Sequence, residues 1–331
     1  MNAHMNPATQ PVARPPRWQI LLAFGIIYFV WGSTFYAIRV GVREAPPLLL
    51  AGMRFFAAGL VLYSWLRLRG TPAPSRREWA NASLLGAIIF LLDYGCLFWA
   101  EQRVPSGIAA VMLASIPVFV TLMEIIILRT QRLTVRLSAA LVIGVCGVAV
   151  LMNRSFSMGE VPLNRVAAIA ILLGAFSWSL ATILTRKLRL PEAKAMSSAA
   201  QMLSGGVQLF IAAALFGEFS EFHPRAISWN AWFALLYLIV MGSIVGFTAY
   251  VWLLHHESPT KVGTYAYVNP LVAVALGYFL GGEEIGRRTL VGMLLILTSV
   301  VAITTMRKPE AKPARQIDNE SAAKLSQAEA D

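Results

Sequence analysis

The chain has 331 residues, of which 57% are hydrophobic and 14% are charged, and its formal net charge is +11. A water-soluble protein usually has about 25% charged residues and roughly 45–50% apolar residues. The composition therefore excludes an ordinary soluble fold, and it supplies enough apolar residues for about ten membrane helices of roughly 20 residues each.

Ten apolar runs lie between two polar tails. Residues 1–17 are rich in proline and residues 307–331 lack aromatic side chains, so both are predicted to be disordered cytoplasmic tails. Each run between them is predicted to cross the membrane as a helix. In chain order the runs are 18–38, 48–66, 79–99, 106–128, 135–152, 163–185, 196–216, 229–254, 262–281 and 289–306.

Lys and Arg residues are concentrated in alternate segments between the runs. If the N-terminus is cytoplasmic, the inner segments hold 19 of the 28 basic residues and the outer segments hold 8, with Arg54 inside the second run. The positive-inside rule then predicts that both termini are cytoplasmic. The basic residues thus face lipid headgroups, so the expected partner is the lipid bilayer and not a nucleic acid.

The ten runs repeat as five plus five. An offset of 147 residues places the first two runs on the sixth and seventh, with Trp31 on Trp178. An offset of 153 places the fourth and fifth runs on the ninth and tenth, with Pro117 on Pro270. Because five is odd, the second repeat is inverted in the membrane, which suits alternating access. The predicted domains are repeat 1 (18–152) and repeat 2 (163–306).

Two prolines lie near the middle of matching runs, Pro117 in the fourth and Pro270 in the ninth. A proline inside a helix removes a backbone hydrogen bond and frees a carbonyl group. Such groups are tolerated in a membrane where neighbouring helices or a wet cavity satisfy them. The prolines are predicted to be helix kinks that flank a central binding site; the alternative is a kink that serves packing alone.

Polar and aromatic side chains in the first, sixth and ninth runs are candidates for a substrate cavity. They recur at helical spacing, so each group shares one face of its helix. The alternative is ordinary helix packing. The candidates found from this spacing are Trp31, Thr34, Trp178, Thr182, Tyr265 and Asn269.

Charged residues inside the runs are costly, at roughly 2.5–3.5 kcal/mol near mid-span. Arg54 lies about 10 Å and Asp93 about 9 Å from the outer side at 1.5 Å per residue. Their similar depth predicts an Arg54–Asp93 ion pair, either an outer gate or substrate charge handle, or a structural pair. Gln201, the repeat mate of Arg54, is expected at the same site.

Glu124 is a candidate proton site near the cytoplasmic end of the fourth run; the alternative is local pairing with Arg129. The motifs for ATP binding, for zinc proteases and for serine hydrolases are missing from the sequence. The sequence thus predicts neither an enzyme nor a metal or cofactor site, and it leaves open whether the chain forms a homodimer.

Three short motifs carry a family resemblance. They are Trp31-Gly32-Ser33-Thr34-Phe35, Val104-Pro105-Ser106-Gly107-Ile108-Ala109-Ala110, and Tyr265-Ala266-Tyr267-Val268-Asn269-Pro270 with Gly281-Gly282-Glu283 after it. Together they resemble EamA-type members of the drug/metabolite transporter superfamily, most closely the bacterial inner-membrane exporters. Where the second repeat has Gly281-Gly282-Glu283, the first has Leu128-Arg129-Thr130, which departs from the pattern.

The resemblance implies an all-α integral membrane protein with ten transmembrane helices in two inverted five-helix EamA repeats. It implies a central cavity lined by the first four spans of each repeat, with Trp31, Ser33, Asn269 and Pro270 at the motif positions. The expected function is export of small organic solutes (metabolites, amino acids or drugs) across the bacterial inner membrane. The alternatives are an uncoupled facilitative carrier and a membrane scaffold that transports nothing.

Overall fold

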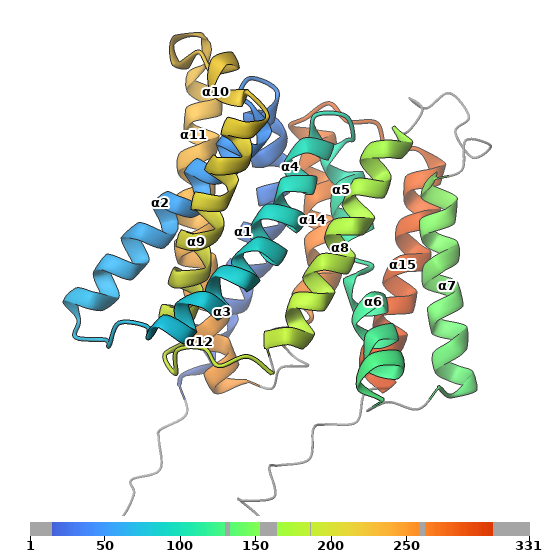
Figure 1. Cartoon of the computed structure of the whole chain (residues 1–331). Helices are drawn as coiled ribbons and strands as arrows, with labels where there is room; N and C mark the ends of the chain where they lie inside the picture. The colour runs from blue at the N-terminus through green and yellow to red at the C-terminus, as the bar shows by residue number, and fades with distance from the viewer. Residues whose placement is uncertain (1–14, 130–132, 153–163, 186, 258–261, 307–331) are drawn as a thin grey trace, which may run out of the picture.

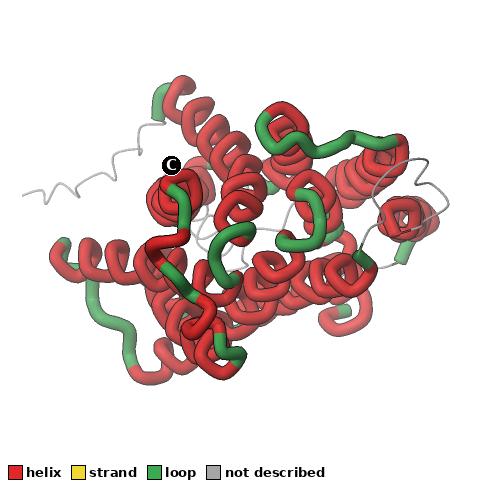
Figure 2. Tube along the Cα trace, turned by 90° about the horizontal axis from the view of Figure 1, so that it is seen from above, coloured by secondary structure: helices red, strands yellow, loops and turns green. Residues whose placement is uncertain are grey.

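The computed structural model describes residues 15–129, 133–152, 164–185, 187–257 and 262–306. Within these ranges the elements are helices, with no strands, and they form one bundle (Figures 1 and 2). The fold is therefore all-α, as predicted. Most of the two predicted tails, together with Thr130, lies outside the described residues.

The first repeat supplies five spans. The first two are α1 (Arg17–Val42) and α2 (Pro47–Leu68). The third joins α3 (Arg76–Gly86), the π-helix η1 (Ala87–Tyr94) and α4 (Gly95–Glu101). The fourth joins α5 (Ser106–Leu113), α6 (Ile116–Met123) and the π-helix η2 (Glu124–Leu128), and the fifth is α7 (Val135–Met152).

The second repeat follows the same order. Its first two spans are α8 (Arg165–Thr185) and α9 (Lys194–Leu215), followed by the short helices α10 (Glu218–Glu221) and η4 (Pro224–Ala226). The eighth span joins α11 (Trp229–Tyr237), the π-helix η5 (Leu238–Val245) and α12 (Gly246–His256). The ninth is α14 (Tyr265–Phe279) and the tenth is α15 (Arg287–Met306).

Nine of these helices are long and apolar enough to cross a membrane, counting only described residues. The tenth predicted span, α14, has 15 residues and so measures about 22 Å, somewhat less than a bilayer core. The observed helices are consistent with the ten predicted spans. We call the end of the bundle where α1 begins and α15 ends the terminal end, and the opposite end the distal end (Figure 1).

Local sequence explains where α2 and α3 begin and end. Pro47 occupies the first turn of α2, where its missing N–H costs nothing. Gly70 follows α2 with φ +82°, a left-handed conformation that ends helices and suits glycine. Ser75 and Glu78 then form a capping box at the start of α3. These signals place the turn between the two spans at the terminal end.

Glycines at matching positions bring the repeats together. A Cβ added at Gly59 of α2 would lie 2.7 Å from the backbone nitrogen of Leu203 of α9. A Cβ added at Gly206 of α9 would lie 2.6 Å from the backbone nitrogen of Phe56 of α2. Both pairs are related by the offset of 147, so the α2–α9 contact is symmetric between the repeats. Small residues at such contacts let membrane helices approach closely.

The third and eighth spans each contain a π-helix in their middle. η1 and η5 have the same length and begin 151 residues apart, between the two offsets found in the sequence. π-helical turns are rare and are frequent at functional sites. Each π-helix packs against the first and second spans of the opposite repeat, η1 against α8 and α9, and η5 against α1 and α2.

The two predicted proline kinks differ. The fourth span is interrupted at Ala114 and Ser115, so Pro117 lies in the first turn of a new helix, α6, and not inside a continuous one. Pro270 lies inside α14, which continues through it. The Ser179 hydroxyl of α8 donates to the Ile116 carbonyl at 3.2 Å, which satisfies one backbone group beside the interruption.

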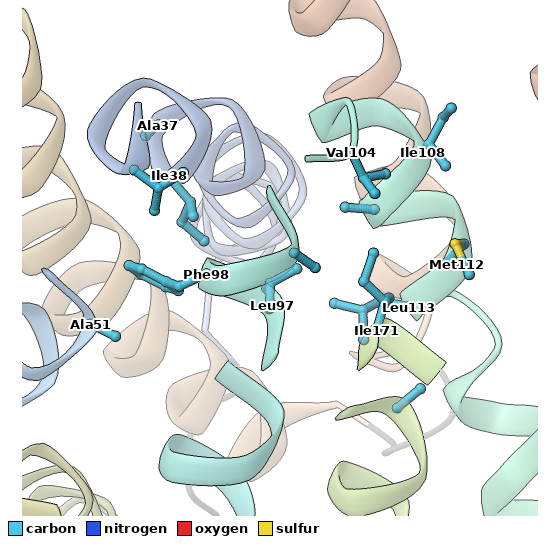
Figure 3. Close-up of a cluster of buried hydrophobic side chains, with 14 of the residues drawn as sticks. Ala37, Ile38, Ala51, Leu97, Phe98, Val104, Ile108, Met112, Leu113 and Ile171 are labelled. Atoms are coloured by element: carbon cyan, nitrogen blue, oxygen red, sulfur yellow. The ribbon is translucent and has the colours of Figure 1, made fainter. Parts of the chain in front are cut away.

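The main apolar core surrounds α4. Leu97 and Phe98 of α4 lie between Ile38 of α1 on one side and Leu113 of α5 and Ile171 of α8 on the other (Figure 3). Spans of both repeats therefore meet around the distal half of the third span. This packing positions the side chains described next.

Candidate functional site

Trp31 of α1 is the centre of an aromatic cluster formed with the second repeat. Its ring centroid lies 5.0 Å from that of Tyr265 and 5.2 Å from that of Tyr250. Its indole Nε1 donates to the carbonyl oxygen of Gly242 at 3.1 Å. Asn269 completes the cluster: with its amide nitrogen turned toward the carbonyl oxygens of Tyr28 and Tyr265, it lies 3.1 Å from each. The structure thus brings Trp31, Tyr265 and Asn269 together.

A second aromatic cluster forms around Tyr94, the last residue of η1. The Tyr94 ring centroid lies 4.6 Å from Phe55, 6.5 Å from Phe98 and 6.2 Å from Trp178. Trp178, the repeat mate of Trp31, therefore contacts the first repeat as Trp31 contacts the second. The Tyr265 phenol lies within electrostatic range of the Tyr94 phenol, so the two clusters are neighbours.

Arg54 lies against the second cluster and bonds to the opposite repeat. It is 2% exposed, and its Nε donates to the Ser243 hydroxyl of η5 at 3.1 Å. Its guanidinium carbon lies 4.6 Å from the Phe55 ring centroid and 5.3 Å from that of Tyr94, which is cation–π geometry. Its Nη1 has no hydrogen-bond partner. A buried cation with an unused donor is thus enclosed by aromatic rings where the repeats meet.

The predicted Arg54–Asp93 ion pair was wrong. Arg54 reaches across to Ser243, whereas Asp93, 3% exposed, has an Oδ1 atom with no hydrogen-bond partner. This Oδ1 faces α8, since a Cβ added at Gly174 would lie 2.6 Å from it. Asp93 lies within η1, and the sequence depth used to pair it with Arg54 contained no information about the direction of its side chain.

The remaining candidate residues mostly bond within their own helices. Thr34 and Thr182 donate to the carbonyls of Trp31 and Trp178, and Gln201 donates to Ser197 at 2.9 Å. Ser33 differs, because its hydroxyl lies 2.6 Å from the Tyr237 hydroxyl of α11. Glu124 is buried at the start of η2. Their predicted roles stay predictions.

Two clefts open elsewhere in the structure. The larger, about 840 Å³, lies at the distal end between the α1–α2 loop, the third span and the end of α9. The smaller, about 350 Å³, is lined by Ser33, Tyr237 and apolar residues of α1 and α14. Neither cleft is lined by Trp31, Trp178 or Tyr265. Those three side chains pack against aromatic neighbours, and each is partly exposed.

Three carboxylates at the distal end cross from one repeat to cap a helix of the other; we call them the distal caps. Glu283 accepts hydrogen bonds from the Ser106 N–H and hydroxyl, at 2.7 and 2.8 Å, and from the Gly107 N–H at 3.1 Å, at the start of α5. A carboxylate at a helix N-terminus accepts hydrogen bonds from the free N–H groups there, and its negative charge is attracted to the positive end of the helix dipole. The caps therefore tie the two repeats together.

The other two distal caps act in opposite directions. Glu218 of the second repeat accepts from the N–H groups of Leu48 and Leu49, at 3.2 and 2.8 Å, at the start of α2. Glu44 of the first repeat accepts from the Ser228 N–H and hydroxyl, at 2.6 and 2.7 Å, at the start of α11. Burial raises the pKa of Glu218, whereas the Ser228 hydrogen bonds lower that of Glu44.

Sequence reasoning missed most of these residues. Glu283 belongs to the Gly281-Gly282-Glu283 motif and Ser106 to the motif that begins at Val104. The sequence did not predict the hydrogen bond between them. The signal that was present is a proline before or within the first helical turn, at Pro47 and Pro105, which marks the N-termini that need caps. Nothing in the sequence shows which carboxylate crosses between the repeats.

Comparison with known proteins decides the family. The model of the EamA-like transporter family matches residues 17–153 and again residues 165–305, which together are most of the chain. The chain belongs to this family. The two matches confirm the two repeats, and the protein is a membrane transporter with many spans.

Relatives of this EamA protein agree with that assignment. It is 38% identical to the uncharacterized inner membrane transporter YedA of Escherichia coli K12, over 86% of this chain and 92% of YedA. It is 26% identical to protein PecM of Dickeya dadantii, over 87% of this chain and 95% of PecM. A solved crystal structure at 18% identity superposes with a TM-score of 0.58 and covers 88% of this chain and 99% of that one, which supports the fold.

Proposed function

We propose that this EamA protein is a secondary transporter that exports small organic solutes across the inner membrane by alternating access. The observation that carries the proposal is the buried Arg54, which lies over the Phe55 and Tyr94 rings of the second cluster and donates to Ser243 of the opposite repeat. Metabolites, amino acids and drugs are the solute classes considered.

The chemistry of this centre suits a polar organic molecule. An unsatisfied buried donor such as Arg54 Nη1 costs about 1–3 kcal/mol. A solute oxygen that accepts from this donor would recover part of that cost. The neighbouring rings of Phe55, Tyr94 and Trp178 offer faces for an apolar or aromatic part of the solute.

The inverted repeats support alternating access. The α2–α9 contact is symmetric, so the repeats can rock about it while their ends open in turn. The charge count predicts that the distal end faces the outside. On that orientation, the three distal caps join the repeats at the outer side, and we expect them to break when that side opens. The prolines Pro117 and Pro270 would set the bends of the fourth and ninth spans beside the centre.

The test is an export screen. Cells with and without the protein are exposed to a panel of metabolites, amino acids and drugs, and tolerance and efflux of each compound are measured. The proposal expects at least one compound to be exported by the wild-type chain and not by Arg54→Ala. Arg69→Ala is the matched control, because Arg69 also lies over an aromatic ring, that of Trp65 at 5.3 Å, but is exposed.

Two outcomes favour the alternatives. Export of no compound by a well-expressed chain would favour a scaffold. Export that does not respond to an imposed pH gradient in vesicles would favour an uncoupled facilitative carrier. Asp93→Asn is included in the vesicle assay, because Asp93 is a buried carboxylate with an unpartnered oxygen.

A further inference from the structure

Glu101, the last residue of α4, is the most deeply buried carboxylate among the described residues. It is 0% exposed, and neither carboxylate oxygen has a hydrogen-bond partner. Its neighbours in the chain, Phe98 and Val104, belong to the apolar core (Figure 3). Glu101 thus lies at the distal end of the third span, next to residues of the apolar core.

Two cations and one other carboxylate lie near Glu101 without bonding to its side chain. Arg39 of α1 donates through Nη1 to the main-chain oxygen of Glu101, and its Nε has no partner. Arg54 of α2 and Glu283, which precedes α15, interact with Glu101 electrostatically. Glu101 therefore lies between the central arginine and a distal cap.

The other packed elements add little charge. Helix α5 has no titratable side chain, and α8 contributes only the exposed Arg165. Within its own span, Asp93 is eight residues away, about 12 Å along a helix. Arg103, two residues later, is exposed and donates to the Trp99 carbonyl. No described side chain supplies the hydrogen bonds that an ionised Glu101 needs.

An ionised carboxylate removed from water without hydrogen bonds costs several kcal/mol, even with cations nearby. Such a group becomes neutral by taking up a proton. We propose that Glu101 is a proton-binding site of the transport cycle. The proton comes from water at the distal side before the distal end closes, and the carboxylic acid is neutral while it is closed.

Proton binding at Glu101 would act on both neighbouring sites. With Glu101 ionised, the charges of Arg39, Arg54, Glu101 and Glu283 balance, and with Glu101 neutral one positive charge is in excess. Movement of the repeats that lets Arg39 or Arg54 pair with the carboxylate returns the proton to water. The inference rests on the proposed transport function and names its coupling ion.

The direct test labels the wild-type chain in phospholipid vesicles with dicyclohexylcarbodiimide, an apolar reagent that adds to protonated carboxyl groups. Labelled peptides are mapped by mass spectrometry between about pH 5 and about pH 9. Glu101 is expected to be labelled at low pH, and its labelling should fall as pH rises, by up to about tenfold per pH unit once it ionises. Glu283 and Glu44 are matched controls, because both oxygens of each carboxylate already accept hydrogen bonds, unlike those of Glu101.

Two results would overturn the proposal. One is labelling of Glu101 no stronger than that of Glu283 at every pH in a folded, monodisperse sample. The other is strong labelling that does not change with pH, since a permanently neutral group exchanges no proton. Because the wild-type chain is used, the test does not depend on whether a variant folds.

A second measurement assigns the proton by infrared difference spectroscopy between low and high pH. Glu101→Gln should lose one protonated-carboxyl C=O signal that Asp93→Asn retains; retention by Glu101→Gln would contradict the assignment. Neither measurement requires a transported solute. A chain that exports a solute but shows no titrating Glu101 would refute this inference alone, and a titrating Glu101 in a chain that exports nothing would refute the transport proposal alone.

Discussion

The distal and terminal ends of the bundle join the two repeats with different chemistry. At the distal end, the carboxylates of Glu44, Glu218 and Glu283 each cap a helix of the other repeat. Toward the terminal end, neutral groups connect the repeats. Asn81 donates to the Arg189 carbonyl at 2.8 Å, and the Tyr28 and Thr264 hydroxyls lie 2.5 Å apart.

This difference has an energetic meaning. Hydrogen bonds to charged groups contribute about 1.5–3 kcal/mol, whereas neutral ones contribute about 0.5–1.5 kcal/mol. The distal end is therefore the more firmly held of the two. The sequence has the same asymmetry, because the first-repeat position that matches Glu283 is Thr130. If the first repeat also had a carboxylate at position 130, we would expect the same type of cap at both ends of the bundle.

The largest loss of folded protein is expected from a change at the α2–α9 contact, because this contact joins the two repeats along the bundle. Gly206→Leu places a side chain against the backbone of Phe56 and forces α2 and α9 apart. Overpacking usually costs about 1–3 kcal/mol, and here neither backbone can yield easily. We expect loss of folded protein, measured as monodisperse yield in detergent. Gly25→Leu is the control, because a Cβ there meets nothing within 4 Å, and equal yields for the two variants would contradict the prediction.

The next effect compares the ends directly. Glu283→Ala removes three hydrogen bonds from the start of α5, whereas Asn81→Ala removes one neutral bond at the terminal end. We expect Glu283→Ala to lose about 2–3 kcal/mol and Asn81→Ala about 1 kcal/mol. Thermal unfolding of both variants in the same detergent measures the difference. A larger loss for Asn81→Ala would show that the distal caps do not dominate.

A smaller effect concerns pH. The Ser228 hydrogen bonds lower the pKa of Glu44 below its ordinary value of 4.5. Its contribution to stability is therefore complete above that ordinary value and is lost as pH falls through the lowered value. Because Glu44 is exposed, we expect only a few tenths of a kcal/mol. The measurement is the unfolding temperature of wild type minus that of Glu44→Gln, which should shrink toward zero in acid.

The contribution of Glu218 to stability should change with pH in the opposite direction to that of Glu44. Burial, the largest cause, raises its pKa, although the N–H groups of Leu49 and Leu48 oppose this. Its contribution is then greatest below the unfolded pKa and declines as pH rises through the folded pKa. Glu218→Gln should remove this decline. A Glu218→Gln curve that follows that of Glu44→Gln would show that burial does not control this cap.

Much of the fold could be read from the sequence. The apolar runs gave the spans within a few residues, because a bilayer core fixes both helix length and composition. The Trp31 and Trp178 match gave the repeat, and their symmetric aromatic contacts are its structural counterpart. The interruption before Pro117 was not predicted, since the same residue is compatible with a kink or a first turn.

The candidate site was only partly predictable. Tyr265 and Asn269 were expected on one face because helical spacing fixes which residues of a helix share a face. Trp31 packs against Tyr265 in the structure, and the role of all three in a substrate cavity stays a prediction. Arg54 and Asp93 were wrongly paired, because depth along a helix says nothing about direction around it. Glu101 was missed, because its burial depends on helices distant in the sequence, namely α1, α2 and α8, and a glutamate at a span end ordinarily reaches water.

The most direct test of the central claim measures distances across both ends by double electron–electron resonance in lipid nanodiscs. With Cys96 and Cys146 replaced by alanine, one spin-label pair occupies the exposed distal positions Arg103 and Glu284, and another occupies the exposed terminal positions Arg77 and Glu192. Glu283→Gln should add a longer distance at the distal pair and shift the terminal pair toward shorter distances, as alternating access requires. An unchanged distal distribution, or a widening of both pairs together, would contradict the account.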